Sequence, residues 1–186
     1  MSVHKKNTLY DFDFQKEIDS LSKYSDMALR QWEPIWTPFL SGQIREEAIK
    51  IYKNLNDVIC SSFGGYKNAE RQRLCFIRNE NQIPSLDSKI PIKGLYLKGN
   101  FLFDRARPND FRKAIENLGV KNGEIGDIWL IRDRGAQAIC SEECAITINN
   151  KIGKIRDVEI QVQAMITTDM EIPFQRTPKI INTVEA

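Results

Sequence analysis

The sequence is nearly devoid of histidine: among 186 residues only His4 occurs, in a polar N-terminal segment. Without a histidine on a rigid part of the fold, Ser-His and Cys-His catalytic pairs and histidine-rich metal sites are excluded. Carboxylate or lysine catalysis stays chemically possible, but no pattern indicates it. We therefore expect a protein that is not an enzyme, with no catalytic residue and no small-molecule substrate.

Long apolar runs are also absent. No stretch of about 18 apolar residues, the length that a membrane-spanning helix needs, occurs anywhere, and the mean hydropathy is -0.42. The segment Met1–Asn7 is polar and is followed by Asp11 and Asp13, where a secretion signal would need an apolar stretch. We expect a cytoplasmic protein without a membrane span.

Cysteine is scarce, with four residues in the chain. Cys140 and Cys144 are four positions apart, which can place them on one helix face, but a zinc knuckle uses a closer spacing and no histidine lies nearby. In a protein without a secretion signal these side chains are expected to be reduced thiols. The sequence predicts no bound metal and no cofactor.

Apolar residues, in contrast, make up 41% of the chain and aromatic residues 9%, which is enough to build a core. The net charge of +2 is unevenly distributed. Residues 61–113 hold 11 Lys and Arg against 5 Asp and Glu, whereas residues 1–60 and 114–186 are net negative. Two interpretations of the basic third remain open: a solvated charged face, or a patch that binds phosphate groups.

The first half of the chain is predicted to be mainly helical. Apolar residues recur at helical spacing over residues 14–24 and 44–55, and Ser41 can cap the second helix. Two prolines predict an irregular turn over residues 32–39. We therefore place a helical N-terminal domain, with a Gly-Gly turn at Gly64-Gly65, over residues 1–78, and a polar connector over residues 79–91. The end of this domain is predicted as a β-prone stretch, a short helical turn and a strand, over residues 58–63, 67–73 and 74–77.

The second half alternates strands and helices in the order βαββαβ. Strands are predicted at residues 92–98, 127–132, 136–140 and 158–162, with helices that begin at Pro108 and after Ser141. This order is typical of a ferredoxin-like, RNA-recognition-like domain, here over residues 92–165. The fold class is therefore α+β. Residues 166–186, which contain two prolines, are predicted to be an extended linker.

Six cations in the basic third are candidate RNA-binding residues. Lys67, Arg71 and Arg73 follow the Gly-Gly turn, and Lys98, Arg105 and Arg107 flank a Gly-Asn turn before a helix. Lysine and arginine side chains at such turns can hold phosphate groups, and we predict that the six lie on one connected surface. For the first group a plain turn, with Arg71 in a structural bridge, is the alternative.

The sheet of the second domain offers little for base stacking. RNA-recognition modules stack bases on aromatic residues of their first and third strands. The first predicted strand contributes Tyr96, and the third, residues 136–140, contributes none. RNA is therefore expected to be held by charge and shape.

Several motifs resemble the YlmH family. They are Phe63-Gly64-Gly65-Tyr66 with Ala69-Glu70-Arg71 and Arg73, the stretch Gly99 to Arg105, the positions Asp110-Phe111, Ala114 and Leu118-Gly119, Gly126-Asp127-Ile128, and the final Thr183-Val184-Glu185-Ala186. The similarity runs from about Ala28 to the end, and the subgroup that it resembles is the photosystem II S-four domain proteins. Many relatives have Thr-His-Arg-Asp where this chain has Arg107-Pro108-Asn109-Asp110.

The resemblance implies a helical N-terminal region, an RNA-recognition-like domain and a C-terminal S-four RNA-binding domain, toward which residues 166–186 would lead. It also implies association with the large ribosomal subunit, ribosomal RNA and transfer RNA, in quality control of stalled peptidyl-tRNA. We expect an RNA-binding protein. The alternative is a protein-interaction or assembly factor linked to photosystem II.

Overall fold

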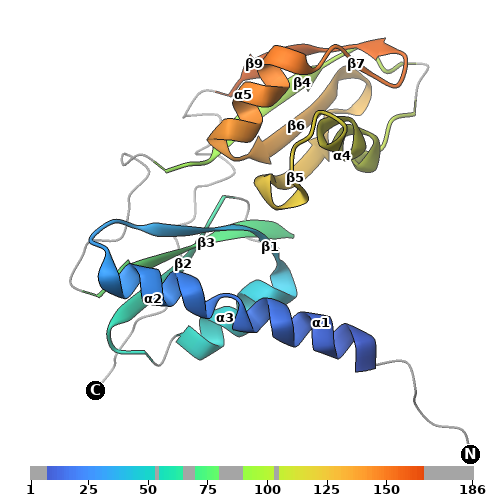
Figure 1. The fold of residues 1–186 in the computed structure, drawn as a ribbon. Helices are drawn as coiled ribbons and strands as arrows, with labels where there is room; N and C mark the ends of the chain where they lie inside the picture. The colour runs from blue at the N-terminus through green and yellow to red at the C-terminus, as the bar shows by residue number, and fades with distance from the viewer. Residues whose placement is uncertain (1–7, 53–54, 65–69, 80–89, 103–104, 166–186) are drawn as a thin grey trace, which may run out of the picture. The chain divides into compact units, whose positions relative to one another are not determined.

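The computed structural model describes residues 8–52, 55–64, 70–79, 90–102 and 105–165, with side chains from Asp13 onward. These residues belong to two compact units. Of the described residues, the first unit comprises 8–52, 55–63 and 73–79, and the second comprises 64, 70–72, 90–102 and 105–165. Each unit contains both helices and a sheet, which confirms the α+β class (Figure 1).

The first unit packs three helices against a three-stranded sheet (Figure 1). Its elements are α1 (Thr8–Asp19), α2 (Ser22–Arg30), β1 (Ile35–Ser41), α3 (Gly42–Tyr52), β2 (Val58–Phe63) and β3 (Arg71–Arg78). The strand order is β1-β3-β2, and β2 and β3 run antiparallel. Apolar residues from both layers, such as Leu21, Ala28, Ala48, Leu74 and Phe76, form one core.

Three local predictions for this unit were wrong. Residues 35–39 lie in β1 rather than in an irregular turn. Because β1 is an edge strand, Pro38 can be accommodated although it has no N–H to donate to a neighbouring strand. The helix predicted over residues 14–24 is interrupted between α1 and α2, and Arg71–Arg73 begin β3 instead of ending a helical turn.

The second unit is built on a four-stranded antiparallel sheet with two helices on one face (Figure 1). Its main elements are β4 (Lys93–Lys98), α4 (Pro108–Glu116), β5 (Ile125–Leu130), β6 (Gly135–Cys140), α5 (Glu142–Lys151) and β9 (Gln161–Ala164). The order β5-β6-β4-β9 is the ferredoxin-like arrangement predicted from the sequence. The single strand predicted over 158–162 is divided between β9 and a small hairpin of β7 (Lys154–Ile155) and β8 (Val158–Glu159).

The two helices of this unit start as their sequences predict. Ser141 caps α5, since its hydroxyl oxygen accepts the Cys144 N–H at 3.1 Å. Before α4, the Arg107 N–H donates to the Asp110 carboxylate at 2.7 Å, and Pro108 occupies the first helical turn. Phe111 and Ile115 are fully buried in the core, whereas Lys113 on another face of α4 is exposed.

The boundary between the units does not follow the chain order. Residues 70–72, which the prediction includes in the N-terminal domain, group with the second unit. The buried Asp127 carboxylate accepts the Glu70 N–H at 2.9 Å and the Arg71 N–H at 3.0 Å. Burial raises the pKa of Asp127 above its usual range, although the two amide bonds oppose that shift.

Candidate nucleic-acid interface

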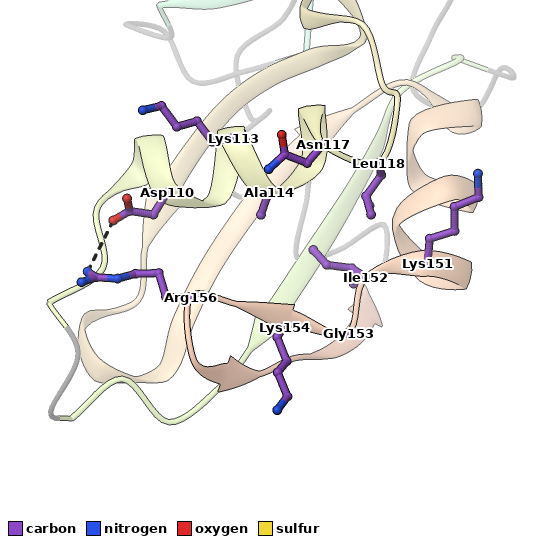
Figure 2. A pocket seen from close by; sticks show the side chains of 10 residues that line it. All are labelled: Asp110, Lys113, Ala114, Asn117, Leu118, Lys151, Ile152, Gly153, Lys154 and Arg156. Carbon is purple, nitrogen blue, oxygen red and sulfur yellow. Dashed lines mark ion pairs between the residues drawn. The ribbon is translucent and has the colours of Figure 1, made fainter.

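An open groove of about 440 Å³ lies on the helix side of the second unit, between α4, the end of α5 and β7 (Figure 2). We call it the basic groove. Its lining comprises four cations, three apolar side chains and three further residues: Lys113, Lys151, Lys154 and Arg156; Ala114, Leu118 and Ile152; and Asp110, Asn117 and Gly153.

One stripe of α4 forms a wall of the basic groove. Asp110, Lys113, Ala114 and Asn117 are spaced three, four and seven residues apart, so they project from the same helix face. The opposite face carries the buried Phe111 and Ile115. The amphipathic pattern that anchors α4 on the sheet therefore also fixes which polar side chains reach the groove.

The floor of the basic groove is apolar. Ala114, Leu118 and Ile152 are half-buried and pack against the core of the unit. Because their inner sides are held by the core, the floor has a fixed shape. A ligand that enters meets apolar surface at the bottom and charged groups at the rim.

The charge of the lining is positive, since it holds four cations and a single carboxylate, that of Asp110. An Arg156 nitrogen lies 3.8 Å from the Asp110 carboxylate (Figure 2), and Lys154 lies 4.0 Å from Glu159. Both ion pairs are largely exposed to solvent, so each carboxylate neutralises the charge of its partner only weakly. Lys113 and Lys151 form no ion pair with another described residue. The basic groove is therefore suited to an anionic ligand.

Arg156 adopts a backbone conformation that is rare for arginine. Its φ is 53°, in the two-residue turn between β7 and β8, where glycine or asparagine is usual. Such a conformation costs on the order of 1 kcal/mol. The turn directs the guanidinium to Asp110 and to the Arg105 carbonyl oxygen, which accepts from it at 3.4 Å. Strain of this kind is often kept where a side chain has a function.

Two of the six predicted RNA-binding residues lie beside the basic groove. Arg105 and Arg107 are exposed and precede α4 at the end where Arg156 and Asp110 meet. Lys98 is exposed at the end of β4, where it donates to the Gln163 side chain and lies over the Tyr96 ring.

The other predicted residues have different surroundings. Arg71 donates to the Asn122 side-chain oxygen at 2.8 Å and to its carbonyl at 3.2 Å. Arg73, in the first unit, donates to the Thr37 carbonyl oxygen at 2.5 Å. Lys67 lies outside the described residues. The structure thus brings Arg105 and Arg107 next to the cations of the basic groove.

The sequence prediction missed the four cations of the groove itself. Three of them fall in residues 114–186, the most acidic third of the chain, so that counting charge over long segments concealed them. A shorter window would have found Lys151, Lys154 and Arg156, which occur within six residues that include no acid. Only the fold brings Lys113 to the same place.

The sheet face opposite the helices has one aromatic more than the prediction assigned to it. Tyr96 is half-buried and lies across from Gln137 on β6 and Gln163 on β9. Trp129 of β5 lies across from Gln137 on its other side, so the four side chains form a row. The sequence prediction considered only the first and third strands, which is why it left out Trp129.

The thiols do not form an exposed site. All four cysteines are buried and free, and burial raises the pKa of Cys60 and Cys75 to about 12. A hydrogen bond with Cys144, together with burial, raises the pKa of Cys140 well above its usual range. Among the described residues no three His, Cys, Asp or Glu side chains gather as metal ligands would. No helix within the described ranges is long and apolar enough to cross a membrane.

The chain is similar to a protein-family model and to solved structures. Residues 15–81 match the family model described as YlmH, N-terminal. The structure is similar to that of the cell division protein ylmH from Streptococcus pneumoniae, with a TM-score of 0.63 and 15% sequence identity, over 91% of this chain and 96% of that chain. No curated protein matches the chain.

Proposed function

We propose that this chain, whose residues 15–81 match the YlmH N-terminal family model, is an RNA-binding protein that acts on ribosomes. Its targets in this proposal are ribosomal and transfer RNA of large subunits that carry stalled peptidyl-tRNA. It acts in the cytoplasm, by binding rather than by catalysis, and needs no cofactor. The observation that carries the proposal is the basic groove, with Arg105 and Arg107 beside it.

The groove and its neighbours suit the RNA backbone. Phosphate groups are bound by lysine and arginine side chains that keep their charge and can reach into solvent. Lys113, Lys151 and Lys154 are exposed, as are Arg105 and Arg107. A single carboxylate, Asp110, lines the groove, so little negative charge opposes the approach of RNA.

The test replaces the groove lysines. The combined variant Lys113→Gln, Lys151→Gln, Lys154→Gln is expected to bind ribosomal RNA fragments at least tenfold more weakly, because each lost phosphate contact removes a salt-sensitive share of the affinity. Fluorescence anisotropy of labelled RNA fragments measures the dissociation constant. The matched control is Lys121→Gln, an exposed lysine of the same unit that does not line the groove. An equal loss in the control would refute the site, and wild-type protein without RNA affinity would refute the function.

The alternative, a protein-interaction or assembly factor linked to photosystem II, has its support in the first unit. Met27, Leu29 and Trp32 are large apolar residues near the end of α2, and Trp32 is 67% exposed. Large exposed aromatic side chains such as Trp32 are enriched at protein-protein contacts. The same binding experiment separates the two functions, since a protein that serves only as an assembly factor has no RNA affinity for the lysine variant to lose.

A further inference from the structure

We infer that the basic groove receives one unpaired nucleotide of RNA, with its base on the apolar floor and its phosphates on the cations around it. This inference rests on the proposed RNA binding and makes it more specific. A patch that only attracts backbone charge needs no cavity. The basic groove has one, and its chemistry changes from rim to floor.

The size and the lining of the groove favour a nucleotide. A volume of about 440 Å³ falls in the range of roughly 300–1,000 Å³ that small-ligand sites occupy. The apolar floor of Ala114, Leu118 and Ile152 has no partner in an RNA duplex, whose outer surface presents phosphates and sugars. An unstacked base, by contrast, offers an apolar face to such a floor.

Asn117 adds a group that can hydrogen-bond to a base edge. It lies at the end of α4, where its backbone N–H donates to the Lys113 carbonyl at 2.9 Å and so fixes its position. Its exposed side chain carries both a donor and an acceptor. Figure 2 shows it beside the apolar residues of the groove. Polar recognition is thus available next to the floor.

Gly153 keeps the groove open. A Cβ atom built on Gly153 meets no atom within 4 Å, and its φ lies outside the left-handed region. Its carbonyl oxygen accepts the Ile160 N–H at 2.9 Å, which holds this backbone in place. A larger side chain therefore meets no clash at its Cβ and adds bulk to the lining of the groove. This position allows the cavity to be filled without a change of charge.

The experiment compares Gly153→Leu with wild-type protein on three RNA probes: a single strand, a blunt duplex, and the same duplex with one bulged nucleotide. Loss of the base contact is expected to weaken binding of the single strand and the bulged duplex by about tenfold. Binding of the blunt duplex is expected to stay within about twofold, because the groove cations remain. Asn149→Leu, at an exposed α5 position that does not line the groove, is the matched control and leaves all three affinities unchanged.

The outcomes separate the inference from the function. If Gly153→Leu binds the bulged and single-stranded probes as wild type does, nucleotide insertion is refuted while RNA binding stands. If the wild-type protein binds none of the three probes, both nucleotide insertion and RNA binding are refuted. Thermal unfolding of Gly153→Leu verifies the fold. A second measurement needs no variant: titration of wild-type protein with adenosine monophosphate should move the amide NMR signals of Asn117 and Ile152. Movement confined to Tyr96 and Gln137 would overturn the inference.

Discussion

At the scale of single residues, the buried Asp127 joins the second unit to residues far away in the sequence. Its carboxylate binds the N–H groups of Glu70 and Arg71, which are 57 and 56 positions away in the sequence. Asp127→Ala leaves both donors without this acceptor, so the free energy of unfolding should fall by about 1–3 kcal/mol. Chemical denaturation measures it. An unchanged free energy of unfolding would show that the two bonds contribute nothing to folding.

The pH dependence of this residue has an unusual sign. Because burial raises the pKa of Asp127 in the folded state, the folded protein binds its proton more tightly than the unfolded chain does. This tighter proton binding stabilises the folded state below the pKa of aspartate in the unfolded chain, about 3.9. The stabilisation is lost as the pH rises through the pKa of Asp127 in the folded protein. The stability of wild type relative to Asp127→Asn should therefore fall as the pH rises over this interval.

At the scale of elements, the turn of the β7–β8 hairpin holds Arg156 in a strained backbone conformation that places its charge at the groove. Arg156→Asn replaces a strained residue by one that tolerates positive φ, so the free energy of unfolding should stay equal or rise by up to about 1 kcal/mol. RNA affinity should fall severalfold, because a groove cation is removed. Denaturation and anisotropy measure the two effects.

A matched control for this hairpin exists in the same unit. Arg132 also has a positive φ, 40°, and is exposed, but it does not line the groove. Arg132→Asn should change stability in the same direction and leave RNA affinity unchanged. A clear loss of stability in Arg156→Asn would instead make Arg156 a structural residue of the hairpin.

The elements also show how far sequence reasoning reaches. The strands β4 and β6 and the helices α4 and α5 were predicted because period, cap and turn residues act locally. The strand β1 was missed, because Pro38 is compatible with a strand only at a sheet edge and edges are set by tertiary pairing. The hydrogen bonds from the Glu70 and Arg71 N–H groups to Asp127 join positions that no local pattern connects.

At the scale of the whole molecule, two surfaces of the second unit compete as the RNA site. One is the basic groove with Arg105 and Arg107, and the other is the sheet face with Tyr96. The combined reversal Arg105→Glu, Arg107→Glu should weaken binding to ribosomal RNA at least tenfold, since it replaces attraction to phosphate by repulsion. Tyr96→Ala should have a smaller effect. A larger effect of Tyr96→Ala, measured by co-sedimentation with large ribosomal subunits, would place RNA on the sheet.

The candidate site could be predicted only in part, because its cations come from elements that are distant in the sequence. Arg105 and Arg107 stand out in the sequence because they are close together in a basic segment. The groove combines Lys113 of α4 with Lys151 at the end of α5 and with Lys154 of β7. These elements meet only because the sheet brings its two helices and the hairpin together. Counting charge along the sequence cannot show that they are neighbours.

The most direct test of RNA binding in the basic groove is its salt dependence. The dissociation constant for a single-stranded ribosomal RNA fragment is measured over a series of salt concentrations, for wild type and for the variant Lys113→Gln, Lys151→Gln, Lys154→Gln. Three lost phosphate contacts should make the slope of log affinity against log salt shallower by about 2. Parallel slopes for the two proteins would contradict the assignment of the groove as the RNA-binding site.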